Sequence, residues 1–97
     1  MTLSVAMFEP HVGSAFFIPL NSDEQAVFML DRVEDKTDPK TSYASFSLFF
    51  SADAPFLLPQ GAYPLQHAVL DEQFIFLVPV SREGSKVIYQ ACFNVEA

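Results

Sequence analysis

The stretch Ala44-Ser-Phe-Ser-Leu-Phe-Phe50 decides the fold, because its side chains alternate between apolar and polar with a period of two. In an extended chain this pattern gathers one set of side chains on a single apolar face: Ala44, Phe46, Leu48 and Phe50. Ser45 and Ser47 lie on the other face. The pattern predicts a half-buried β-strand, since the apolar residues of a helix would recur every three or four positions.

Four more segments carry strand signals: 15–20, 26–33, 73–80 and 87–96. The last of them alternates as cleanly as the opening stretch. By contrast, 73–80 is apolar in both phases, which is typical of a strand covered on both faces. We expect Phe74 and Phe76 in the core, with Ile75 and Leu77 on the opposite face.

Proline and glycine mark where these strands are interrupted. Proline has no backbone N–H, so Pro19 and Pro79 place their strands at a sheet edge or at a bulge. A bulge near Asp31 would bring the apolar residues on either side of it onto one face. Gly84 can adopt positive φ and suits a hairpin loop before the last strand.

The segment Leu58-Pro-Gln-Gly61 has the composition of a β-turn, because Pro59 presets φ and Gly61 stands at the fourth position. It predicts a rigid corner between strands, with Gln60 inside it. His67 follows on the same stretch. Its simplest interpretation is a structural histidine that bonds a loop backbone.

These elements fit one domain that spans residues 1–97. Residues 3–9 add one or two helical turns, which Pro10 and Gly13 would end. The predicted fold is all-β: a small antiparallel barrel or strongly curled sheet of about six strands, with a short N-terminal helical turn. Closing the sheet would also protect the edges of such apolar strands.

Composition narrows the class of partner. The chain has 12 acidic against 5 basic residues and a net charge of −7, which opposes nucleic-acid binding. Its one cysteine, Cys92, cannot form an intrachain disulfide, and the N-terminus has no signal-peptide pattern. No apolar run is long enough for a membrane span. We expect a cytoplasmic address by default, with export by a non-Sec route left open.

Few residues suggest chemistry. His67 lies close in sequence to Asp71 and Glu72, and a histidine paired with a carboxylate is the smallest general-base arrangement. No serine stands in a nucleophile elbow, and Cys92 has no basic neighbour in the sequence. His11 and His67 lack the spacing of a metal site, and glycine is too scarce for a phosphate-binding loop. We predict no cofactor, no metal and no enzyme activity.

The aromatic surplus is the more open feature, since 11 phenylalanines and 3 tyrosines exceed what one small core needs. If the alternating strands fill a barrel, the remaining apolar side chains point outward: Phe49, Ile75, Leu77 and Ile88. Either the N-terminal segment covers them, or they form an interface with a protein partner or a second copy.

Five short motifs carry a resemblance to a known family: Phe46-Ser-Leu-Phe-Phe50, Leu58-Pro-Gln-Gly-Ala-Tyr63, Leu65-x-His67, Phe76-Leu-Val-Pro-Val80 and Tyr89-x-Ala91-x-Phe93. Through them, most of the chain resembles DUF6916, an uncharacterised bacterial family. Its members carry proline after the histidine and glycine before the next strand, where this chain has Ala68 and Asp71. The resemblance implies no activity. It does imply a place in a phage-tail-like or secreted fibre assembly, because relatives lie near genes for phage tail collar-like proteins.

The leading hypothesis is therefore a non-enzymatic structural or accessory domain that acts through its apolar outer strand face. A first alternative is a small-ligand-binding β-barrel, which would need a cavity of several hundred Å³ inside the barrel. A second is a hydrolase-like enzyme that uses His67 and Asp71, which would need a serine or Cys92 within hydrogen-bond reach of the histidine.

Overall fold

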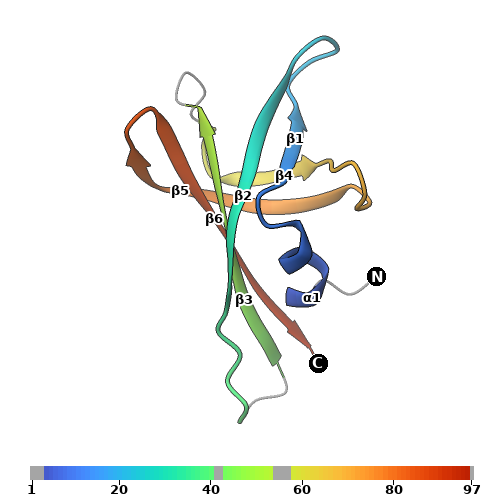
Figure 1. The fold of residues 1–97 in the computed structure, drawn as a ribbon, viewed down its shortest axis with the longest axis vertical. Helices are drawn as coiled ribbons and strands as arrows, with labels where there is room; N and C mark the ends of the chain where they lie inside the picture. Colours follow the sequence, from blue (N-terminus) through green and yellow to red (C-terminus); the bar gives the residue numbers. More distant parts are fainter. Residues whose placement is uncertain (1–3, 41–42, 54–57, 97) are drawn as a thin grey trace.

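The structure is a computed structural model that describes residues 4–40, 43–53 and 58–96. Its strands form one antiparallel, barrel-like sheet preceded by a short helix (Figure 1), which confirms the predicted fold class. The elements are α1 (Val5–Phe8), the 3-10 turn η1 (Glu9–His11), β1 (Ala15–Pro19), β2 (Gln25–Asp35), β3 (Tyr43–Asp53), β4 (Gly61–Leu65), β5 (Gln73–Glu83) and β6 (Lys86–Glu96).

The sheet has the order β1-β2-β3-β6-β5-β4, so two three-stranded meanders meet where β3 pairs with β6. Each meander consists of strands of 5, 11 and 11 residues, and each has a bulge in its middle strand. The bulges lie between Leu30 and Arg32 and between Pro79 and Ser81, which confirms the predicted breaks near Asp31 and at Pro79. A bulge bends its strand, and both middle strands thereby curl the sheet toward closure.

Closure occurs at a narrow seam between β1 and β4, which meet in Figure 1. Phe17 and Gln66 exchange both backbone hydrogen bonds, each 2.8 Å long. In this register Pro19 falls opposite Pro64, at the next position where two antiparallel residues would bond each other. Both residues lack the N–H that the seam needs, so the barrel stays nearly closed instead of fully closed.

Phenylalanines fill the interior. Phe46, Leu48 and Phe50 are buried as predicted. Tyr89 is also fully buried, and its hydroxyl accepts from the Leu58 N–H at 3.0 Å. One open end is covered by α1, whose Phe8 is fully buried. The ring centroid of Phe8 lies 6.2–6.5 Å from those of three core aromatics: Phe16, Phe46 and Phe93. The described part of the N-terminal segment therefore completes the core through Phe8.

The predicted facing of β5 is wrong. Ile75 and Leu77 lie in the core with at most 1% of their surface exposed, whereas Phe74 and Phe76 are 72% and 53% exposed. Pairing with β4 sets this phase, because residues directly opposite each other share a face. Leu65 of β4 is buried, and the alternation of the two strands then turns Ile75 and Leu77 inward.

The loops agree with the sequence more closely. The predicted hairpin with Gly84 joins β5 to β6: Glu83 pairs with Lys86, and Gly84 adopts a φ of 62° between them. The corner before β4 bends at Gln60, and the Tyr63 hydroxyl donates to the Pro59 carbonyl at 2.5 Å. Gly61 is already the first residue of β4.

Candidate functional site

The outer surface of the second meander carries an apolar patch, which we call the β4–β5 face: Ala62, Pro64, Phe74 and Phe76. Two cross-strand pairs build it, Ala62 with Phe76 and Pro64 with Phe74. Neither small partner residue is large enough to cover the ring opposite it. The two phenylalanines therefore present most of their aromatic surface to solvent.

The other predicted interface residues do not extend this patch. Phe49 points outward from β3, but the guanidinium of Arg32 lies 3.9 Å from its ring centroid and leaves only 9% of it exposed. Arg32 is held there by Glu34, whose carboxylate accepts from Nε at 2.9 Å. Ile88 is half-buried on the outer face of β6. Ile75 and Leu77 lie in the core, so the exposed apolar residues of this part of β5 are Phe74 and Phe76 instead.

A polar cluster lies next to the seam, and we call it the His67 cluster: Ser14, His67 and the backbone carbonyl of His11. His67 follows Gln66 of the seam directly, and Ser14 precedes β1. Ser14 Oγ is 2.9 Å from His67 Nε2 and 2.6 Å from the His11 carbonyl oxygen. On its other side, His67 Nδ1 accepts from the N–H groups of Val69 and Leu70 at 3.0 and 3.2 Å.

This geometry fixes the tautomer of His67. Two N–H donors require a lone pair on Nδ1, so the proton of the neutral ring is on Nε2 and is donated to Ser14 Oγ. Ser14 in turn donates to the His11 carbonyl. Burial and the charge of neighbouring His11 lower the pKa of His67, which also favours the neutral ring.

The His67 cluster brings a serine to the histidine, as the hydrolase hypothesis required, but here the histidine donates the hydrogen bond and the serine accepts it. A general base must accept the serine proton at Nε2, where His67 carries its own proton. The position at Nδ1 that a carboxylate would occupy is taken by backbone N–H groups, and Asp71 makes no bond to the ring. The arrangement suits a structural histidine. Sequence reasoning missed Ser14, which is 53 residues away and has no motif around it.

Cys92 and the carboxylates do not gather into a metal-binding group in the described part of the chain. Cys92 is exposed on the outer face of β6, where Ser47 Oγ lies 3.5 Å from its sulfur. Among residues 4–40, 43–53 and 58–96, no group of three or more histidine, cysteine or acidic side chains is placed to hold a metal ion. Every buried side-chain nitrogen and oxygen of these residues has a hydrogen-bond partner.

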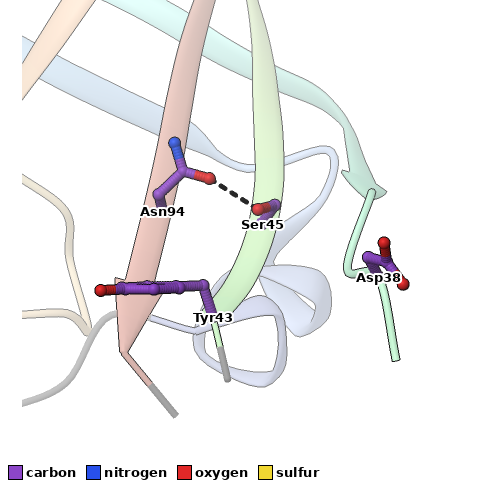
Figure 2. Close-up of a pocket in the computed structure, with 4 residues that line it drawn as sticks. All are labelled: Asp38, Tyr43, Ser45 and Asn94. Carbon is purple, nitrogen blue, oxygen red and sulfur yellow. Dashed lines mark hydrogen bonds between the residues drawn. The ribbon is translucent and has the colours of Figure 1, made fainter. Parts of the chain in front are cut away.

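A groove of about 370 Å³ lies at the far end of the β3–β6 ribbon. Figure 2 shows its lining: Asp38, Tyr43, Ser45 and Asn94. Ser45 Oγ donates to Asn94 Oδ1 at 2.6 Å, so these two polar groups satisfy each other. Asp38 directs its carboxylate away from the other three in Figure 2. The groove is open and lies outside the barrel, unlike the interior cavity that a ligand-binding barrel would need.

No helix within the described residues is long and apolar enough to cross a membrane. Comparison with curated proteins and with solved structures found no match for the chain. One family model does match, over residues 3–93 of the 97, and therefore includes every strand up to the second half of β6. The chain belongs to this family, described as Domain of unknown function (DUF6916).

Proposed function

We propose that the domain is a non-enzymatic interaction module that binds a protein partner through the β4–β5 face. The observation that carries the proposal is the exposure of Phe74 and Phe76, at 72% and 53%, on consecutive outward positions of β5. The outward positions of β3 include serines at 45, 47 and 51, together with Phe49, which Arg32 covers. The fold is therefore compatible with polar residues there, and its stability does not explain the two phenylalanines.

The size of the patch supports a partner that inserts a small apolar element. The two rings expose roughly 250 Å² together, given about 200 Å² for a whole phenylalanine side chain. Burying that area is worth about 6 kcal/mol before the costs of association are subtracted. A stable dimer of folded domains buries about 800 Å² on each side, more than this patch offers.

The charge of the molecule supports a partner other than a second copy. Asp71 and Glu72 are exposed directly before β5, at the end where Phe74 lies, and the chain has a net charge of −7. Two such faces would bring like charges together, which disfavours self-association. A partner with an apolar centre and a basic rim complements the face. The phage-tail-like or secreted fibre assembly implied by the family resemblance would supply such a partner.

The test uses two variants with the same new residue. Phe74→Thr with Phe76→Thr removes the face but keeps residues that favour strands, and Val27→Thr removes an exposed valine from β2 as the matched control. Proteins captured by the wild-type domain are identified, purified and measured by calorimetry. We expect the double variant to weaken binding by about 100-fold or more and the control by less than about threefold.

Three results would contradict the proposal. They are equal binding by the double variant, a loss caused by Val27→Thr instead, and the capture of no protein. Light scattering on the purified domain decides the remaining choice. A wild-type dimer that Phe74→Thr with Phe76→Thr dissociates would make a second copy the occupant of the face and refute the basic partner.

A further inference from the structure

The seam between β1 and β4 depends on very few hydrogen bonds. Phe17 and Gln66 supply two, and the prolines at 19 and 64 prevent the next two. The His67 cluster lies at the other side of this pair and connects the same two chain segments. The bond from His67 Nε2 to Ser14 Oγ joins the end of β4 to the start of β1. The seam and the His67 cluster therefore together join β1 to β4 and close the barrel.

Both bonds at Nδ1 of His67 require the neutral ring. Nδ1 faces the two N–H groups of Val69 and Leu70, so a proton added at Nδ1 would point at two donors. Protonation would break both bonds and release the loop after His67. Because the imidazole is rigid, a ring that turns Nδ1 away from these donors also moves Nε2 away from Ser14 Oγ. The ring is also packed between aromatic neighbours, with centroid distances of 4.5 Å to Phe16 and 4.7 Å to His11.

No described carboxylate is placed to pair with the charged form of His67. The charged or titratable groups on the elements packed against it are Glu9 and His11 on η1, Tyr63 on β4, and Asp71 and Glu72 in the β4–β5 loop. The Glu72 carboxylate accepts from the Gln66 amide at 2.8 Å, and the Tyr63 hydroxyl donates to Pro59. Of the described carboxylates none forms an ion pair with His67, while His11 adds like charge.

The seam also anchors the segment that covers the core. Ser14 connects η1 to β1, and its hydroxyl donates to the His11 carbonyl, which holds the end of η1 in place. Directly before η1, Phe8 is fully buried against the open end of the barrel. Loosening Ser14 and the start of β1 would therefore loosen the attachment of α1 and η1, and would uncover aromatic core residues.

We propose that protonation of His67 opens the seam between β1 and β4 and frees the N-terminal α1–η1 segment, so that the domain contains an acid-sensitive conformational switch. This proposal is independent of the β4–β5 face. It concerns the opposite end of the loop that joins β4 to β5. The switch acts in one direction only: the seam between β1 and β4 is closed at neutral pH and opens on acidification.

The test follows the ring and the seam in the same sample. Nitrogen NMR of the whole labelled chain reports the tautomer and titration of His67, and amide hydrogen exchange reports protection of Phe17, Gln66, Val69 and Leu70 from about pH 7.5 to about pH 5. Protection factors, which correct for the pH dependence of exchange itself, are compared with those of Leu48 in the β3–β6 ribbon. We expect seam protection to fall about tenfold or more at the pH where His67 titrates, with less than about twofold change at Leu48.

Two variants separate His67 from its neighbour. His67→Asn keeps an acceptor near the position of Nδ1 but cannot titrate in this range, so its seam protection should not depend on pH. His11→Gln removes the other histidine and should leave the acid-induced opening in place. Opening that persists in His67→Asn would overturn the proposal. So would wild-type seam protection that stays constant through the titration of His67, a result that holds even if a variant fails to fold.

Discussion

The same substitution at two neighbouring residues of β5 should change the free energy of unfolding by very different amounts. Ile75 is 1% exposed and Phe74 is 72% exposed, whereas the sequence pattern predicts the reverse facing. We compare Ile75→Thr with Phe74→Thr, because threonine favours strands at either place and the loss of β-propensity is small in both. Any difference between the two variants therefore reports facing.

The expected magnitudes follow from burial. Ile75→Thr removes apolar volume from a filled core and buries a hydroxyl, which together cost about 2–4 kcal/mol. For a domain of this size about 5–15 kcal/mol is available in total, and each kcal/mol corresponds to about 4–8 °C in Tm. Phe74→Thr removes a ring that is mostly in water, so its effect on the free energy of unfolding should stay below about 1 kcal/mol.

The measurement is urea and thermal unfolding followed by far-UV circular dichroism and tyrosine fluorescence, since the chain has no tryptophan. The reasoning is refuted if Phe74→Thr loses as much stability as Ile75→Thr. That outcome would restore Phe74 to the core, and it would remove the physical basis for the β4–β5 face. If only Ile75→Thr loses much stability, Phe74 lies on the surface, as the β4–β5 face requires.

Three further predictions concern the seam, the outer face of β3 and pH. Replacing Pro19 and Pro64 together by threonine should extend the seam, seen as new protected amides at both positions, while the free energy of unfolding changes by less than about 1 kcal/mol because lost proline rigidity offsets the new bonds. Arg32→Gln should cost about 0.5–1 kcal/mol in urea unfolding by uncovering Phe49, and no measurable loss would show that the stacking is inconsequential. Because the pKa of His67 is lowered in the folded state, the unfolded chain binds this proton first as the pH falls below 6.5. The contribution of His67 to the free energy of unfolding, measured in urea, should therefore be intact above pH 6.5 and be lost below it. His67→Asn should abolish that part of the pH dependence.

Much of the fold could be predicted from the sequence because its signals are local. Alternation in 44–50 reports one buried face directly. Pro79 marks a bulge because it has no backbone N–H, and the change in apolar phase around Asp31 marks the other bulge. The seam could not be predicted. Whether Pro19 meets Pro64 depends on a register between strands that are far apart in the chain, and the same is true of Ser14 and His67.

The facing of β5 was unpredictable for a different reason, which bears on function. When the residues on both faces of a strand are apolar, alternation cannot show which face is turned to the core. The usual interpretation is then a strand covered on both sides. Here nothing within the described chain covers Phe74 and Phe76, while the core holds Ile75 and Leu77. β5 thus has the sequence pattern of a strand buried on both faces, but within the described residues only its inner face is buried. On β3, by contrast, the outward Phe49 is covered by Arg32 and the positions beside it are serines. We therefore propose that another molecule supplies the missing cover on β5, in a contact that centres on Phe74 and Phe76.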